Sequence, residues 1–269
     1  MALKDITLGQ YFPGDSIVHR LDPRTKIILV VVYIISLFTA KFVFSYGIVM
    51  AVLITCILLS RVGFKAIFKG MKAVFIIILI TAILNLFYNS SGTLLVHFWR
   101  ISIYTGGVRM AIMMVLRIMM LISGTFLLTY TTSPIQLTDG IESLLGPLKK
   151  LHLPIHELAM MMSIALRFIP TLIEETDKIM SAQKARGADF ESGNLIQKAK
   201  ALVPLLVPLF VSAFRRADEL ATAMECRCYH GDSGRTRMKK LTYAPRDGVA
   251  LALGAVVLAA VLVLRHFGL

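Results

Sequence analysis

Two arginines at matching positions of a repeated pattern are the residues of this chain best suited to bind a partner. Each follows a helical run and is flanked by two small residues: Ala185 and Gly187 around Arg186, and Cys226 and Cys228 around Arg227. When the two arginines are superimposed, residues 177–182 fall over residues 218–223. A guanidinium can pair with a carboxylate through two parallel hydrogen bonds, and small neighbours let it enter a groove. The pattern therefore predicts two equivalent docking points.

A simpler explanation exists for each arginine taken alone. A cation in the last turn of a helix is stabilised by the helix macrodipole by about 0.3–1 kcal/mol, with no partner needed. For a single arginine this explanation would be preferred. Two copies at equivalent ends of duplicated helices favour the docking explanation instead. They indicate a partner with two lobes. Breaking a buried charge pair is strongly destabilising, which suits a contact that transmits force.

Motifs for nucleotide, metal or covalent chemistry are missing from the sequence. It has no G-x-x-x-x-G-K-[ST] phosphate loop and no nucleophile elbow. His156-Glu157 begins a zinc-protease pattern, but Met160 occupies the place of the second histidine. Cys226 and Cys228 do not form a C-x-x-C motif. We therefore expect no catalytic residue, no metal and no cofactor in this chain.

The composition is that of an integral membrane protein. Hydrophobic residues make up 57% of the chain and charged residues 17%, with a mean hydropathy of +0.74. Soluble domains average about 45–50% apolar and about 25% charged residues. A bilayer core of about 30 Å needs roughly 20 residues of helix. Five apolar runs are expected to span it, of which the first is short: residues 27–40, 42–60, 73–89, 108–130 and 247–264.

The chain divides into four regions with different expected roles. Residues 1–26 form an N-terminal segment, 27–131 a four-helix transmembrane region, 132–246 a long basic insert, and 247–269 a last transmembrane helix. The fold class expected is an all-α integral membrane protein with about five transmembrane helices. The insert adds a cytoplasmic coupling domain of one short and two long kinked helices.

The distribution of lysine and arginine predicts the orientation. These residues crowd residues 1–26, the loop 61–72 and the insert, whereas the other side carries only Lys41, Arg100, Arg265 and, on our assignment, Arg109. The positive-inside rule places the N-terminus and the insert in the cytoplasm and the C-terminus outside the cell membrane. This accounts for most of the net charge of +13, so no nucleic-acid partner is needed. The polar N-terminus is not expected to be a removable signal peptide.

Capping residues predict the first two helices of the insert. Ser133, Pro134 and Gln136 form the start of a short helix with a capping box. This helix should stop at Gly146-Pro147. A longer helix should run from Pro154 to Gly187, with a kink at Pro170.

The second long helix should run from about Leu195 to Arg227. We expect Pro204 and Pro208 to break it, and Gly231 and Gly234 to end it. Its stretch 201–214 is apolar enough for a sixth span. The two prolines and the flanking charges instead favour an interfacial or buried helix.

The chain resembles the transmembrane T component (EcfT) of energy-coupling factor transporters, which are ABC-type importers of vitamins and trace metals. Four runs carry the resemblance: Ala185-Arg186-Gly187, residues 223–231, His19-Arg20-Leu21-Asp22-Pro23-Arg24-Thr25-Lys26, and Thr131-Thr132-Ser133-Pro134. In that family two coupling helices end in x-Arg-x motifs that insert into grooves on a pair of cytoplasmic ATPases. A separate membrane subunit, the S component, binds the substrate.

The resemblance implies roles for this chain's residues and partners. The ATPase-docking residues would be Ala185, Arg186, Gly187, Cys226, Arg227 and Cys228. ATP and Mg²⁺ would be bound by the two ATPases, and the substrate by the S component. Cys226 and Cys228 stand where alanine and glycine are commoner in the family, which leaves a separate thiol function open.

Methionines and one arginine are notable within the fourth expected span. Five methionines crowd it: Met110, Met113, Met114, Met119 and Met120. Core filling is the simplest explanation, and an adaptable surface for several S components is the alternative, with Met113, Met114 and Met120 as candidates. Arg117 lies about ten residues into this span and needs a partner or a path to water.

We therefore interpret the chain as a scaffold that couples ATP hydrolysis by its partners to micronutrient uptake through an S component. A shared vitamin-type T component is favoured over a dedicated cobalt or nickel one. An ordinary ABC permease with its own translocation path is a rival, as is a membrane-embedded enzyme. The enzyme would need converging polar residues, and only Asn85, Asn89 and Arg117 offer themselves. The transported substrate is not encoded in this chain.

Overall fold

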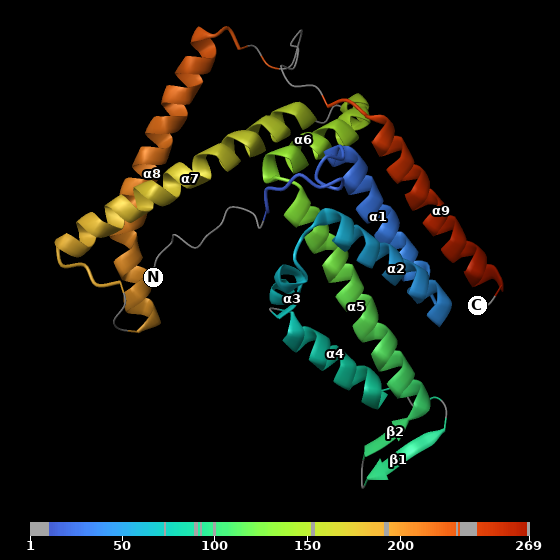
Figure 1. Ribbon diagram of the computed structural model, residues 1–269. Coiled ribbons are helices and arrows are strands. Elements are labelled where there is room, and N and C mark those ends of the chain that lie inside the picture. The colour runs from blue at the N-terminus through green and yellow to red at the C-terminus, as the bar shows by residue number, and fades with distance from the viewer. Residues whose placement is uncertain are drawn as a thin grey trace. The chain divides into compact units, whose positions relative to one another are not determined.

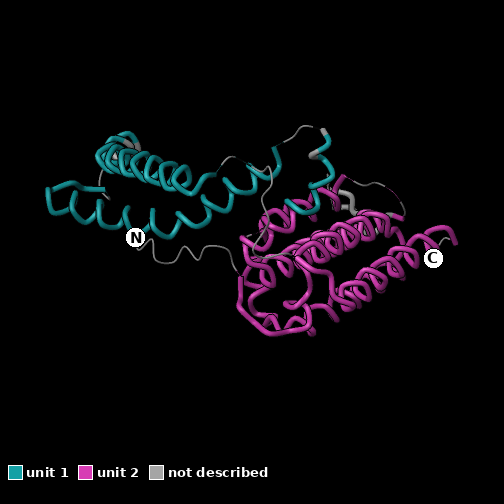
Figure 2. The backbone as a smooth tube through the Cα atoms, turned by 90° about the horizontal axis from the view of Figure 1, so that it is seen from above, with its two compact units in different colours: residues 1–8, 142–240 teal, residues 9–141, 241–269 magenta. Residues whose placement is uncertain are grey.

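The computed structural model describes residues 11–72, 74–88, 91, 93–98, 101–151, 154–190, 194–229, 231 and 241–267. The chain forms two compact units (Figure 2). Unit 1 contains residues 1–8 and 142–240, and unit 2 contains residues 9–141 and 241–269. Residues 132–141 and 241–246, at the two ends of the insert, therefore pack with unit 2.

Unit 2 is a helical bundle with one short hairpin (Figure 1). In chain order its elements are α1 (Pro23–Thr39), α2 (Val43–Ser60), α3 (Phe64–Lys72), α4 (Phe75–Tyr88), β1 (Leu94–Phe98), β2 (Ile101–Tyr104), α5 (Thr105–Thr131), the start of α6 (Pro134–Leu145) and α9 (Pro245–Phe267). Strands β1 and β2 pair antiparallel. The sequence did not predict this hairpin, which joins α4 to α5.

The apolar helices confirm an all-α, multi-pass integral membrane fold. By length and composition α2, α5, α7 and α9 can cross a membrane, and α3 with α4, bent by 67°, would make a fifth span. Two helices at expected spans, α1 with 17 residues and α4 with 14, are shorter than the roughly 20 residues that a bilayer core needs. Helix α7 (Ile155–Ala185) was expected to lie outside the membrane; it meets these criteria with the lowest mean hydropathy of the four, 1.3. This value describes an 18-residue stretch of the helix, which has 31 residues and turns polar from Glu174 onward.

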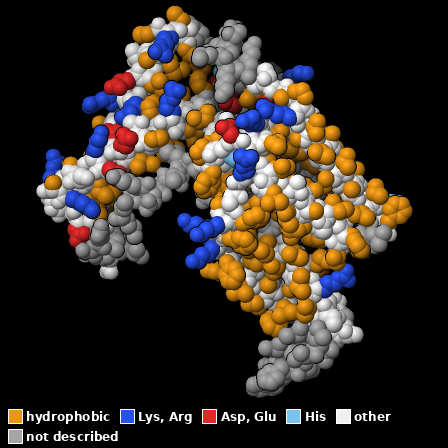
Figure 3. All heavy atoms as spheres, in the orientation of Figure 1, with side chains coloured by type: hydrophobic (Ala, Val, Ile, Leu, Met, Phe, Trp, Pro, Cys, Tyr) orange, Lys and Arg blue, Asp and Glu red, His pale blue; other side chains and the backbone are white. Residues whose placement is uncertain are grey.

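Side chains from several helices form the core of unit 2. Leu37 of α1, Val49 of α2, Met120 of α5 and Val261 of α9 are almost completely buried in it. Hydrophobic side chains also cover much of the outer surface of these helices (Figure 3). Exposed apolar side chains on this scale suit a bilayer environment, where lipid covers them.

Unit 1 contains a 3₁₀ turn (Gly146–Leu151), α7 and α8 (Leu195–Cys226). The capping box predicted for α6 is present, because the backbone N–H of Gln136 donates to Ser133 Oγ and that of Ser133 to Gln136 Oε1, both at 3.3 Å. Helix α8 has a similar box, in which the backbone N–H of Asn194 donates to Gln197 Oε1 at 3.0 Å.

The two prolines of α8 do not break it, contrary to the sequence-based expectation. The helix is continuous through Pro204 and Pro208, as α7 is through Pro170. Proline lacks an N–H, so Pro208 leaves the carbonyl of Pro204 without its usual helical donor. Gln183 Nε2 of α7 donates to that carbonyl instead, at 3.4 Å. A side chain of the neighbouring helix thus compensates for the missing bond.

Candidate functional site: two matched arginine helix ends

The long helices end at the two arginines, as the sequence predicted. Helix α7 ends at Ala185 with Arg186 as its C-cap (φ −88°, ψ 7°). Helix α8 ends at Cys226 with Arg227 as its C-cap (φ −94°, ψ 16°). The two arginines therefore have nearly the same backbone conformation.

The same hydrogen bonds close both ends. In α7 the N–H of Gly187 donates to Lys184 O and that of Ala188 to Gln183 O, both at 3.0 Å. The corresponding bonds in α8 are Cys228 N–H to Glu225 O at 2.8 Å and Tyr229 N–H to Met224 O at 3.0 Å. This pair of bonds is the Schellman motif. The repeat seen in the sequence is thus also a repeat in three dimensions.

The residue after each arginine has a left-handed backbone. Gly187 has φ +88° and Cys228 has φ +54°. The sequence-based expectation that Gly231 and Gly234 end α8 is wrong, because a cysteine takes the left-handed position that glycine usually fills. Gly231 lies beyond the helix with φ +87°, and Gly234 lies outside the described residues.

The strained cysteine gives a testable prediction. A left-handed conformation costs a residue with a Cβ roughly 1–2 kcal/mol, whereas glycine adopts it freely but loses more entropy on folding. We therefore expect Cys228→Gly to preserve or raise protection of the α8 end in hydrogen exchange. Cys226→Gly, a change at the last residue of the same helix, should lower it, because glycine loses more conformational entropy on folding. Equal losses in both variants would contradict the strain at residue 228.

Both arginines are available to a partner. They and their four flanking residues, Ala185, Gly187, Cys226 and Cys228, are exposed. Neither guanidinium makes a hydrogen bond or ion pair with any residue in the described ranges. The two exposed guanidinium groups can therefore donate hydrogen bonds to carboxylates of another molecule.

The two ends lie far apart within unit 1. Gln183, close to the end of α7, contacts Pro204 of α8. From Pro204 to Arg227 the helix rises about 35 Å at ~1.5 Å per residue. Figure 1 shows α7 and α8 crossing, with their C-terminal ends well separated. The arginines can therefore reach two separate sites on a partner.

A polar contact fixes this crossing. Glu175 of α7 accepts hydrogen bonds from the hydroxyl of Ser212 and, at 3.2 Å, from Arg216 Nη2 of α8. The Arg216 guanidinium also lies 5.6 Å from the centre of the Phe168 ring. The side chains of Arg216 and Glu175 are 34% and 24% exposed, so solvent screens this ion pair only in part. Sequence reasoning missed this pair, because both residues look like ordinary members of charged helix faces.

The structure corrects one of the methionine assignments. Met120 is 1% exposed and belongs to the hydrophobic core, so its side chain cannot form a docking surface. Met113 packs partly against the same core, and Met114 is partly buried. Only Met113 and Met114 remain candidates for the surface suggested by the sequence.

Arg117, whose partner the sequence did not reveal, is bound inside the bundle. Its Nε donates to the Tyr46 hydroxyl at 2.7 Å, and its Nη2 donates to Ala40 O at 3.3 Å. The guanidinium also lies 5.9 Å from the centre of the Phe38 ring and 5.7 Å from that of Tyr46. Hydrogen-bond acceptors and aromatic faces thus stabilise this charge.

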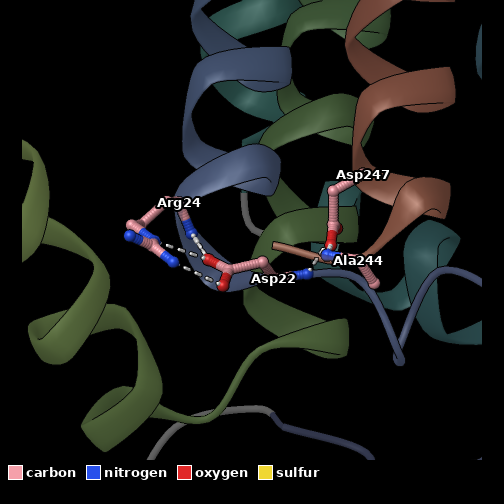
Figure 4. Close-up of polar contacts among 4 residues, drawn as sticks. All are labelled: Asp22, Arg24, Ala244 and Asp247. Carbon is pink, nitrogen blue, oxygen red and sulfur yellow. Dashed lines mark hydrogen bonds and ion pairs between the residues drawn. The ribbon is translucent and has the colours of Figure 1, made fainter. Parts of the chain in front are cut away.

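A second polar cluster surrounds the start of α1 (Figure 4). Asp22 caps this helix by accepting from the backbone N–H of Arg24 at 2.9 Å and from its side chain at 3.1 Å. The buried carboxylate of Asp247 accepts from the backbone N–H groups of Asp22 and Ala244, each at 2.8 Å. The sequence pointed to Asp22 and Arg24, whereas Asp247 gave no signal of its own.

Lys26 lies in the same cluster, directly before the apolar run that begins at Ile27. Its Nζ donates to Thr131 O at 2.8 Å and to His19 O at 3.1 Å. Burial lowers the pKa of Lys26 to about 8, an effect that the nearby carboxylates of Asp22 and Asp247 oppose. Two carbonyls and two carboxylates thus offset the cost of burying this ammonium group.

Comparison with known proteins gives one consistent relationship. Residues 14–238 match the CbiQ family, described as cobalt transport protein. The chain is 57% identical over 265 residues to the energy-coupling factor transporter transmembrane protein EcfT of Clostridium kluyveri, covering 98% of both chains. Proteins of the same name from Acidaminococcus fermentans and Bacillus subtilis are 51% and 49% identical, with 97–98% of each chain covered. The similarity thus includes both arginine ends and the segment before α1.

Proposed function

The chain belongs to the CbiQ family and is a transmembrane subunit of an energy-coupling factor transporter, in which we propose that its two arginine helix ends dock a pair of cytoplasmic ATPases. Through these contacts ATP hydrolysis drives uptake of a vitamin or other micronutrient by a separate S component. The insert is then cytoplasmic, as is the N-terminus, and the C-terminus lies outside.

The matched ends of α7 and α8 carry this proposal. Arg186 and Arg227 have equivalent backbone conformations, are exposed, and are separated by a crossed pair of helices. Two ATPase subunits of one kind offer two equivalent grooves, which calls for two equivalent docking points. An acidic side chain in each groove would pair with the guanidinium in bidentate geometry.

The chain itself is proposed to bind no nucleotide, since its sequence has no phosphate loop. ATP and Mg²⁺ are then bound by the ATPases, and the substrate by the S component. Met113 and Met114 of α5 are candidates for contact with that component. The family description, cobalt transport, keeps a cobalt or nickel substrate as the alternative to a vitamin.

Affinity purification from native membranes tests this function. We expect the tagged chain to bring down two ABC ATPase subunits and a small membrane protein that binds the substrate. The complex should hydrolyse ATP, and the chain purified alone should bind none. Nucleotide binding by the isolated chain, or transport by it without an S component, would contradict the proposal and favour a permease with its own path.

A further inference from the structure

Segment 19–26 comprises the turn before α1 and the first four residues of that helix, and it directly precedes the apolar run that begins at Ile27. It contacts the chain at both ends of the insert, residues 132–246. We call it the pre-helix segment. The departing chain ends α5 at Thr131 and starts α6 at Pro134, while the returning chain starts α9 at Pro245. Both of these connections contact the pre-helix segment, although more than 100 residues separate them.

The departing connection is held at two places. Lys26 Nζ donates to the carbonyl of Thr131 at 2.8 Å, and Lys26 is only 5% exposed. One helix later, Gly140 of α6 packs so closely that an added Cβ would lie 3.1 Å from both Pro23 and Ile27. The middle of α6 thus packs directly on the start of α1.

The returning connection is held by Asp247 and by a ring contact. Asp247 is 1% exposed, and its two carboxylate oxygens accept from Asp22 N–H and Ala244 N–H, residues on different segments (Figure 4). The Arg24 guanidinium lies 4.0 Å from the centre of the Tyr243 ring. These contacts fix the chain at the point where it enters α9.

A charged side chain buried this deeply is costly unless it is fully paired, and unpaired buried donors are costly too. Such contacts gather here at both chain connections of one insert. A segment that only capped α1 would need Asp22 and nothing more. The additional contacts serve the connections.

We propose that the pre-helix segment anchors the insert, with Lys26 and Asp247 as positioning residues that hold both of its chain connections at the start of α1. This inference rests on the proposed function, because a fixed anchor matters when force arriving at the arginine ends must reach the membrane helices. Without the anchor, motion of the insert would be absorbed by its two connections.

Two variants of the full transporter reconstituted in vesicles test the anchor. Asp247→Asn keeps one acceptor oxygen and replaces the other with a donor, and Lys26→Met keeps an unbranched side chain one atom shorter, without the charge. We expect both to lower substrate uptake per ATP hydrolysed at least threefold, with ATPase copurification unchanged. Hydrogen exchange should become faster at residues 20–24 and 242–246 in Asp247→Asn. Lys41→Met, the same change as Lys26→Met but at an exposed lysine beyond the other end of α1, should leave the uptake ratio unchanged.

An unchanged uptake ratio in both variants would overturn the proposal. So would a loss of uptake in strict proportion to loss of bound ATPase, because the cluster would then serve only stability. Failure of the proposed function gives a different result: the unmodified complex would itself show no bound ATPase and no ATP-driven uptake.

Discussion

Replacing both Arg186 and Arg227 with alanine is expected to abolish ATP-driven uptake and to loosen assembly with the ATPases. Both side chains are exposed and make no hydrogen bond or ion pair with the described residues, so the fold should survive. Each replacement removes a bidentate charged contact and leaves a carboxylate of the partner unpaired, at a cost of about 3–5 kcal/mol if the site is buried. Each single variant should therefore weaken ATPase binding at least tenfold, which corresponds to about 1.4 kcal/mol.

The measurements are uptake in reconstituted vesicles and copurification of the ATPases. Arg215→Ala is the matched control, since it removes an exposed arginine from the same helix but away from its end. Lysine at positions 186 and 227 should rescue poorly, because an ammonium keeps the charge without the planar fork. Full uptake by the double alanine variant would mean that these arginines only complete their helix ends.

Reversing one charge of the Glu175–Arg216 pair is expected to separate α7 from α8. Glu175→Arg places two cations at the crossing and leaves the Ser212 hydroxyl without its carboxylate. With the pair partly exposed, we expect a loss of about 1–2 kcal/mol, somewhat below the value for a buried pair. Since the crossing sets the distance between the two arginine ends, uptake should fall severalfold.

A charge exchange tests the pair directly. Glu175→Arg combined with Arg216→Glu should regain most of the uptake lost in either single variant, a coupling that a double-mutant cycle measures. Glu174→Arg, the same change at the adjacent exposed residue, should have little effect. If the exchanged pair behaves as the sum of the two single variants, the ion pair does not hold the crossing.

Local features of the site could be predicted from the sequence, because they depend on neighbours along the chain. The capping box at Ser133, the ends of α7 and α8 and the two arginine caps all arise from bonds that span five residues or fewer. The end of α8 was assigned to glycines since glycine is the usual left-handed residue. In this chain Cys228 takes that conformation, and nothing in its identity signals it.

Contacts between distant segments were decided by the tertiary structure alone. Asp247 bonds to a residue 225 positions earlier, and Arg117 to Tyr46, 71 positions away. Gln183 donates to the carbonyl that Pro208 leaves without its helical donor, and packing buries Met120 in the core although the sequence allowed it a surface role. Composition and helical periodicity determine that such helices form and that lipid covers them. The partner of each polar side chain is fixed only when the helices pack. A buried polar side chain is costly unless it is hydrogen-bonded, and packing decides which groups lie close enough to bond to it.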